Sequence, residues 1–174
     1  LSPPFPGGDV DLGLVFACAD AYFDKAAAAG CSQVFIGMES LNPDNLEAAG
    51  KRQNKAQDYG QMIDVWHEAG IACHVGYIIG FPFDTAESVR EDLRRLREEV
   101  KADQASFFML TPLPGSADHV NMRDGHWLDP DYNNFDSFHP VMEHQRMGLD
   151  EWFDVYKEAW RDFYTVGNMK QILG

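Results

Sequence analysis

Three apolar stretches, each followed by a polar or Gly/Pro-rich turn, are the strongest pattern along this chain. Residues 33–37 lead into Met38-Glu39-Ser40, residues 72–79 into Gly80-Phe81-Pro82, and residues 104–110 into Thr111-Pro112-Leu113-Pro114-Gly115. Apolar residues at helical spacing fill the gaps, so the pattern predicts a β-α-β-α-β order and a parallel sheet. The strands are nearly continuously apolar, which is typical of a sheet covered on both faces. Because ligands bind at the carboxyl ends of parallel strands, the three turns predict a single binding rim.

Six segments carry helical periodicity or helix-end signals. The expected helices cover residues 18–29, a short stretch starting at Asn42-Pro43, and residues 57–69, 85–100, 117–123 and 149–164. The helix over 85–100 has the clearest period, and Asp84 and Glu87 resemble a capping box at its start. The last helix carries an aromatic stripe from Trp152 to Phe163, which favours packing over ligand binding.

Composition and charge narrow the class of protein. The chain has 174 residues, of which 45% are hydrophobic, and this suits a single domain with its own core. Lys and Arg number 14 against 28 Asp and Glu, and the formal charge of −14 disfavours a nucleic-acid partner. No apolar run reaches the roughly 20 residues that span a bilayer, and three cysteines in no framework spacing suit a reducing cytoplasm. The start at Leu1 lacks a signal-peptide pattern and an initiator Met, which favours an excised or processed piece.

Several turn residues carry candidate chemistry of their own. Glu39 follows a strongly apolar strand, where a carboxylate needs a donor or solvent; the alternative is that it caps the following turn. Lys51 lies twelve residues later, next to Arg52, and from the residues alone the two form a solvated basic pair. Gly80 would let the backbone approach a ligand closely, and Pro82 would stiffen that turn.

The histidines and cysteines do not predict a metal site. His139 and His144 are five residues apart, a poor match to the i, i+4 spacing of two ligands on a helix. Cys18, Cys31 and Cys73 have 12 and 41 residues between them, which matches no cluster-binding loop. We therefore expect no metal ligands in this chain.

Four stretches between Gly30 and His119 resemble the second half of a radical S-adenosylmethionine (SAM) domain. They are "AGCSQVFIGMES", "LEAAGKRQN", "GYIIGFPFDT" and "FFMLTPLPGSADH", and their order is similar to strands four to six of that family's partial (β/α)6 barrel. The tail, with "DPDYNNFDSFH" and "EWFDVYKEAWRDFYT", resembles the extension of B12-binding-type radical SAM proteins, or Fe-S oxidoreductases. The resemblance implies an α/β fold, a parallel-sheet partial (β/α) barrel fragment with a helical C-terminal extension. Residues 1–13 would be a loose segment, 14–120 the partial barrel, and 121–174 the extension.

The resemblance implies a fragment of an enzyme that cleaves SAM reductively at a [4Fe-4S] cluster and performs radical chemistry on an unknown small-molecule substrate. This piece would supply part of the SAM cradle and the substrate wall. Family members hold the cluster with a C-x3-C-x2-C loop, which this chain lacks. We therefore expect no cluster and no activity on the chain alone. The missing strands, and any cobalamin domain, would lie upstream.

The resemblance also assigns roles to the turn residues. Glu39 and Ser40 would touch the ribose or amino-acid part of SAM, and Lys51 would pair with its carboxylate. The adenine would lie against Gly80, Phe81 and Pro82 from one strand and Leu110 and Thr111 from the next. His119 is a weaker candidate on the substrate side, and a satisfied surface histidine is its alternative.

A non-catalytic module is the second functional hypothesis. A half barrel has open sheet edges that favour self-association or binding of a partner, so a homo-oligomer is expected for the isolated chain. No nucleic-acid or membrane partner is expected. The sequence upstream of Leu1 would distinguish the two hypotheses, because a cluster-binding cysteine loop there belongs to the first.

Overall fold

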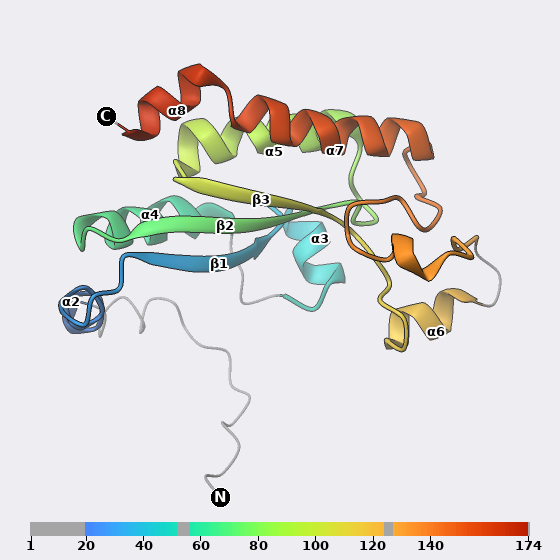
Figure 1. The fold of residues 1–174 in the computed structure, drawn as a ribbon, viewed down its shortest axis with the longest axis horizontal. Helices are drawn as coiled ribbons and strands as arrows, with labels where there is room; N and C mark the ends of the chain where they lie inside the picture. Colours follow the sequence, from blue (N-terminus) through green and yellow to red (C-terminus); the bar gives the residue numbers. More distant parts are fainter. Residues whose placement is uncertain (1–19, 52–55, 124–126, 174) are drawn as a thin grey trace, which may run out of the picture.

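The sheet has three parallel strands in the order β1-β2-β3. The computed structural model describes residues 20–51, 56–123 and 127–173, with strands β1 (Gln33–Glu39), β2 (Ala72–Ile79) and β3 (Gln104–Met109). Gln33 pairs with Ala72 at the start of β1, and His74 pairs with Gln104 at the start of β3 (Figure 1). The predicted α/β class and the parallel order of the strands are confirmed. The finer expectation of a partial (β/α) barrel stays a prediction.

Seven α-helices belong to the described residues. They are α2 (Asp20–Ala28), α3 (Pro43–Ala48), α4 (Tyr59–Glu68), α5 (Ala86–Arg95), α6 (Ala117–Arg123), α7 (Leu149–Phe163) and α8 (Val166–Leu173). Short 3₁₀ turns cover Ala56–Asp58 and Tyr132–Asn134, and α5 continues into one π-helical turn, Leu96–Val100. The sequence pattern did not predict α8. No helix among these residues is long and apolar enough to cross a membrane.

The start of α5 is capped differently from the expectation. Thr85 is the N-cap: the Ser88 backbone N–H donates to its Oγ1 at 3.1 Å, and its own N–H donates to Ser88 Oγ at 2.9 Å. The predicted pair of Asp84 and Glu87 is therefore wrong. Asp84 does not cap the helix because its buried carboxylate accepts hydrogen bonds from the turn after β2.

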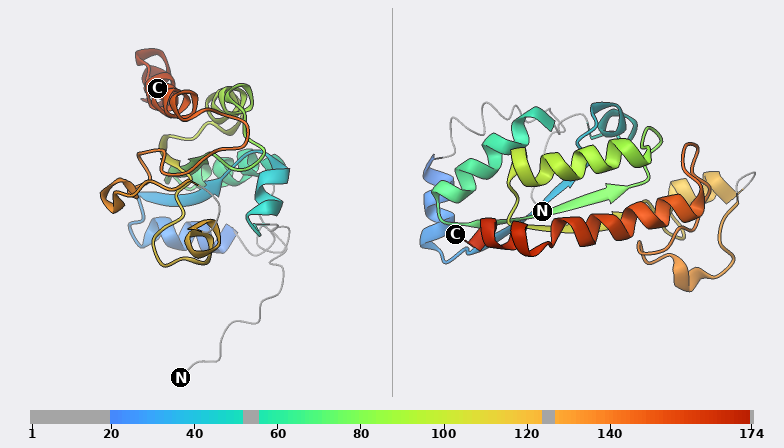
Figure 2. Two further views of the ribbon diagram at one scale, coloured as in Figure 1. Left: turned by 90° about the vertical axis from the view of Figure 1, so that its right-hand side faces the viewer. Right: turned by 90° about the horizontal axis from the view of Figure 1, so that it is seen from above.

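Helices α4, α5 and α7 cover one face of the sheet (Figures 1 and 2). Alternate strand residues on this face are fully buried and form one core with the helices. They are Cys73, Val75, Tyr77 and Ile79 from β2, and Ala105, Phe107 and Met109 from β3. The aromatic stripe of α7 joins this core: Trp152 and Phe163 are buried, and the Phe163 ring lies 5.8 Å from that of Phe107. The stripe serves packing.

The opposite face is much less covered, although both faces were expected to be buried. Phe35 is 61% exposed, and His74, Ser106 and Phe108 on the same face are half-buried. In the figures α2 and α6 lie on this side, near opposite ends of the sheet. Successive strand residues point to opposite faces, and on this face the positions within the apolar runs are partly taken by Gly, His and Ser. The runs therefore looked more continuously apolar than this face is. We call the face formed by Phe35, Gly37, His74, Gly76, Ser106 and Phe108 the uncovered face, although Gly76 itself is buried beneath the Phe35 ring.

Candidate functional site

The end of β1 brings two predicted site residues together. Glu39 has a left-handed backbone (φ 69°), and the pairing with β2 shifts register between Gly37 and Glu39. Its carboxylate folds back over the uncovered face, with Oε1 3.1 Å from the position a Cβ at Gly37 would take. Lys51 Nζ lies 3.7 Å from the same oxygen, and the two side chains are 44% (Lys51) and 21% (Glu39) exposed. A partly exposed pair of this kind adds at most about 1 kcal/mol to stability, so both charges are available to a ligand.

Ser40 lies beneath the rim. Its side chain is completely buried, and its Oγ accepts a hydrogen bond from the Asn42 N–H at 3.1 Å. Nearby, the Tyr77 hydroxyl donates to Asp92 Oδ2 at 2.7 Å. Burial, and then the negative charge of Asp92, holds the pKa of Tyr77 well above its ordinary value. The structure therefore leaves Glu39 at the surface and gives the Ser40 side chain a supporting position.

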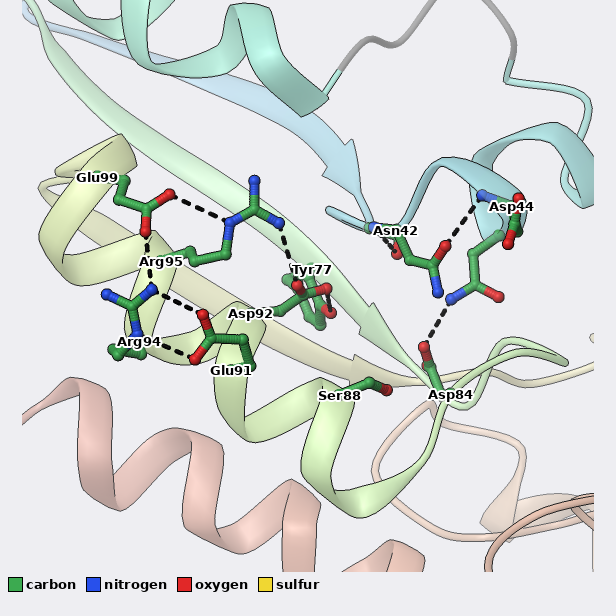
Figure 3. A network of polar contacts seen from close by, with 12 residues as sticks. Asn42, Asp44, Tyr77, Asp84, Ser88, Glu91, Asp92, Arg94, Arg95 and Glu99 are labelled. Atoms are coloured by element: carbon green, nitrogen blue, oxygen red, sulfur yellow. Dashed lines mark hydrogen bonds and ion pairs between the residues drawn. The ribbon is translucent and has the colours of Figure 1, made fainter.

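A buried carboxylate holds the turn after β2. Asp84 Oδ2 accepts from the Gly80 N–H at 2.8 Å and the Phe81 N–H at 3.0 Å. Its Oδ1 accepts from Asn45 Nδ2 at 2.6 Å, the bond drawn as a dashed line from Asp84 in Figure 3. Asn45 in turn accepts from the Phe83 N–H at 3.0 Å. Burial raises the pKa of Asp84, and the three donors oppose that shift. The turn is thus fixed to α3, the helix that lies between Glu39 and Lys51.

The C-terminal segment holds the same turn from the other side. Trp152 Nε1 donates to the Ile79 carbonyl at 3.0 Å, and a Cβ at Gly80 would overlap the Trp152 ring. His144 Nε2 lies 2.9 Å from the Phe81 carbonyl, while its Nδ1 accepts from backbone N–H groups of the following residues. His144 therefore donates through Nε2. Phe81 is buried by these contacts, and Pro82 is exposed at the tip.

The end of β3 lies beside this turn. The Leu110 N–H donates to the Ile79 carbonyl at 2.9 Å, and Thr111 Oγ1 donates to the Met109 carbonyl at 3.0 Å. Both residues are half-buried. The three predicted turns thus share the carboxyl end of one sheet, with Glu39 and Lys51 beyond β1 and the other candidates around β2 and β3.

Below the rim, the uncovered face combines aromatic and polar groups. Gly37 pairs with Gly76, which pairs with Ser106, so small residues cross the three strands in one row. The Phe35 ring leans over this row, with its Cζ 2.8 Å from the position of a Cβ at Gly76. His74 Nε2 and Ser106 Oγ lie 2.8 Å apart beside it. This surface thus combines a flat apolar ring, Phe35, with hydrogen-bonding groups, next to the charged Glu39 and Lys51 at the rim.

The other histidine candidates have structural contacts. His119 is buried, and its ring lies 5.9 Å from Tyr132 and 5.8 Å from Phe135. The exposed His139 pairs with Asp136 at 3.0 Å. These contacts favour packing for His119 over a place on the substrate side.

Sequence reasoning missed the residues that support the rim. Asn45, Asp84, His144 and Trp152 converge on one turn from α3, the turn itself, the C-terminal loop and α7. In the Pro-Phe-Asp-Thr run, Asp84 was interpreted only as a helix cap. No local signal joins it to residues more than sixty positions downstream.

Comparisons with known proteins point to methyltransferases. No family model matches the chain. It is 28% identical over 143 residues to bacteriochlorophyllide d C-12(1)-methyltransferase of Chlorobaculum tepidum, covering 81% of this chain and 30% of that protein. It is 26% identical over 161 residues to bacteriochlorophyllide d C-8(2)-methyltransferase of the same organism, covering 86% and 35%. Tryptophan 2-C-methyltransferase of Streptomyces laurentii is 31% identical over 98 residues, covering 51% and 16%. The chain thus spans about a third or less of the relatives it matches.

Solved structures also include a chain of similar fold. The archaeal Methanocaldococcus infernus Elp3 with an N-terminal deletion superposes with a TM-score of 0.55 at 13% identity, covering 85% of this chain and 40% of that one. At this identity the likeness concerns the fold alone.

These findings correct the functional expectation. The relatives are named for methyl transfer, so the identification as a radical SAM fragment, with reductive SAM cleavage at a [4Fe-4S] cluster, is wrong. The labels Fe-S oxidoreductase and iron–sulfur protein go with it, and none of these names points to cobalamin. The alternative of a non-catalytic module finds no support either. The physical reason is that Gly/Pro turns at the ends of parallel strands are shared by many α/β proteins and do not fix the chemistry.

Proposed function

We propose that this chain is part of an S-adenosylmethionine-dependent methyltransferase. The methyltransferase names of its relatives support the reaction class. The Glu39–Lys51 pair at the carboxyl end of the sheet is the observation from which we place the methyl donor, SAM. SAM, when bound, supplies the methyl group. The residues of this chain would bind and orient it.

The charges at the rim match the polar end of SAM. Lys51 would pair with the carboxylate of its amino-acid part, and Glu39 would accept hydrogen bonds from its ammonium or ribose hydroxyl groups. The pair in the present structure shows that both side chains reach one point. Ser40, buried below, would hold the turn that presents Glu39.

The apolar part of the rim suits the adenine. Gly80, Phe81 and Pro82 with Leu110 and Thr111 would line it, because ligand pockets combine apolar walls with a few fixed polar groups. Asp84 and His144 hold this turn through its backbone and would keep the wall in place. We also propose that residues 14–120 form part of a (β/α) barrel in a longer protein, with residues 121–174 as an extension.

The acceptor would be a flat aromatic small molecule on the uncovered face. Phe35 offers an exposed ring in the middle of a strand, beside the hydrogen-bonding pair of His74 and Ser106. Aromatic rings bind one another through offset or edge contacts. The relatives' names refer to bacteriochlorophyllide d and tryptophan, both of which are aromatic. An isolated chain that self-associates, and a cytoplasmic location, stay predictions.

Calorimetric titration with SAM tests the donor site. We expect Lys51→Ala to weaken binding about tenfold, roughly 1.4 kcal/mol, because the carboxylate loses its charged partner. Lys25→Ala, in the last turn of α2 and away from the rim, is the matched control and should bind as the wild type does. If SAM does not bind to the wild type, or binds equally to Lys51→Ala, the donor placement is wrong.

The same titration separates the two halves of the site. Phe35→Ser should leave SAM binding unchanged and weaken binding of tryptophan, used as the aromatic probe. If the wild type and Phe35→Ser bind tryptophan equally, the proposed acceptor position on the uncovered face is wrong, while the proposed SAM site is not affected.

A further inference from the structure

A second group of reactive side chains lies at the opposite end of the sheet. His67 near the end of α4, Cys73 in β2 and Asp103 before β3 place one ligand atom each within 4.8 Å of one another. Cys73 lies six residues before Ile79 in β2, about 20 Å from the rim at ~3.3 Å per residue. The group is therefore separate from the proposed methyl-transfer site.

The contacts of the group resemble those of a metal site. His67 Nε2 lies 2.7 Å from Asp103 Oδ2, and the Cys73 N–H donates to the same oxygen at 2.7 Å. The backbone bond fixes the carboxylate, as contacts around metal ligands do. The Cys73 thiol is fully buried, while the side chains of His67 and Asp103 are 35% and 23% exposed. The two partly exposed ligands leave a route to the buried one.

Zinc geometry requires only small movements. Zinc binds thiolate, imidazole and carboxylate at about 2.0–2.3 Å, so its ligand atoms stand roughly 3.3–3.7 Å apart in a tetrahedron. Since all three ligand atoms lie within 4.8 Å, no pair must approach by more than about 1 Å, and His67 Nε2 and Asp103 Oδ2, now 2.7 Å apart, must separate by about 0.6 Å. Side-chain rotation of His67, at the end of a helix, supplies this range.

An adjoining cavity supplies space for a fourth ligand. Its volume is about 480 Å³, and its lining includes His67, Asp103 and Gln171. Arg97 and Lys101 also line it, and Arg97 is engaged with the Asp162 carbonyl at 2.8 Å. Zinc sites with three protein ligands keep such an open position for water.

We propose that His67, Cys73 and Asp103 bind one zinc ion at the amino-terminal end of the sheet. The ion would join α4, β2 and β3, and would take the place of the proton now held by the Cys73 thiol. In the metal-free chain burial, and then the charge of Asp103, raises the pKa of the Cys73 thiol to about 12. Binding would therefore release protons, as metal binding to thiols does.

Cobalt(II) substitution tests the site. In a Cys18→Ser/Cys31→Ser background Cys73 is the sole thiol of the 174-residue chain. We expect a thiolate-to-cobalt charge-transfer band and tetrahedral d–d bands that saturate at one equivalent and disappear on adding zinc. Cys73→Ala should abolish the charge-transfer band. His67→Gln and Asp103→Asn should each weaken binding by at least about tenfold. His139→Gln, which removes an exposed histidine, is the control and should change nothing.

A thermal unfolding experiment on the background protein tests the site without relying on variants that could fold poorly. In the background protein, zinc at 100 times its dissociation constant should raise Tm by about 5–10 °C, and a chelator should reverse the shift. Absence of the charge-transfer band and of this shift would overturn the proposal. Binding that persists unchanged in the His67 and Asp103 variants would overturn it as well, and would leave these residues as a hydrogen-bonded clasp.

Discussion

Asp84 is a carboxyl group that the fold buries and then surrounds with donors. It is 1% exposed, and three N–H groups from Gly80, Phe81 and Asn45 reach its two oxygens. Removing an acceptor from such a place costs about 1–3 kcal/mol for each donor left without a partner. The shape of the turn at the rim thus depends on one side chain outside the predicted site.

The titration of Asp84 gives a pH dependence of defined sign. Burial raises its folded pKa above the ordinary 3.8. A raised acid pKa stabilises the fold below the unfolded pKa, and that contribution is lost as pH rises through the folded pKa. We expect the free energy of unfolding of the wild type minus that of Asp84→Asn to fall as pH rises above about 4, by at most ~1.4 kcal/mol per unit. Urea unfolding at a series of pH values measures it.

Asp129 is the matched control for that experiment. The Asp131 N–H and the Asn134 side chain lower the pKa of this half-buried residue's carboxyl group. Asp129→Asn should therefore give a difference that rises with pH in the acid range, opposite to Asp84→Asn. A rising difference for Asp84→Asn would contradict its raised pKa.

Among the elements, α7 and the turn after β2 depend on each other. Gly80 has φ 116°, and the Trp152 ring occupies the space that any side chain there would need. The indole also donates to the strand end at Ile79. Helix and turn are therefore packed as one unit.

Gly80→Ala tests this dependence. We expect the substitution to lower the free energy of unfolding by about 3 kcal/mol or more, because backbone strain adds to displacement of a buried indole. Gly115→Ala is the control: Gly115 also has positive φ (89°), but nothing lies within 4 Å of a Cβ there. It should lose only about 1 kcal/mol. Urea unfolding followed by Trp fluorescence measures both, and equal losses would show that Trp152 adapts freely.

Prediction from sequence succeeded where a local pattern decided the structure. The long apolar runs located β1, β2 and β3, and α3 begins at Asn42-Pro43 as expected, with Asn42 as its N-cap. It failed where tertiary contacts decide: Asp84 bonds to the turn instead of capping α5, and Phe35 is exposed because its face of the sheet is largely uncovered. The short α8 follows α7 after a two-residue break and has a glycine in its first turn, so its period was not seen.

For the site too, residues marked by a local signal were predicted, and residues placed by tertiary contacts were not. Glu39 was found because a carboxylate after an apolar strand stands out, and Lys51 was found through the resemblance, which implies a basic residue at that offset. The structure places the two side chains together. Their role in binding stays a prediction. Asn45, His144 and Trp152 act on a turn far from them in sequence, and no spacing rule joins them. The domain boundaries also stay predictions, and residues 1–13 lie outside the described part of the chain.

At the scale of the whole molecule, the tail occupies the outer edge of β3. The Tyr164 hydroxyl accepts from the Ala105 N–H at 3.1 Å and donates to the Ala105 carbonyl at 2.7 Å. Farther along, the Met109 N–H donates to the Ser137 carbonyl at 2.8 Å. Backbone groups that an edge strand would offer to another chain are thus bonded within this one.

Tyr164→Phe should expose part of that edge. We expect faster hydrogen exchange of the Ala105 amide and a loss of about 1–2 kcal/mol in the free energy of unfolding, because one hydroxyl makes both bonds. Tyr132→Phe removes a hydroxyl from a tyrosine that is 62% exposed and should leave both quantities unchanged. Hydrogen exchange is measured by mass spectrometry. An unchanged exchange rate of the Ala105 amide would mean that the two Tyr164 hydrogen bonds do not protect this edge.

The bonded edge at β3 also leaves β1 as the edge at which the sheet could be extended. Any further strand of a longer protein has to join at β1, since Tyr164 and Ser137 already bond to the other side. Chains emerge from the ribosome amino end first, and domains fold as they emerge. β1 would then be the strand that docks onto whatever sheet already exists, β2 and β3 would follow, and α7 would close the assembly last. On this order, His144 and Trp152 are the last of the residues that hold the turn after β2 to reach it.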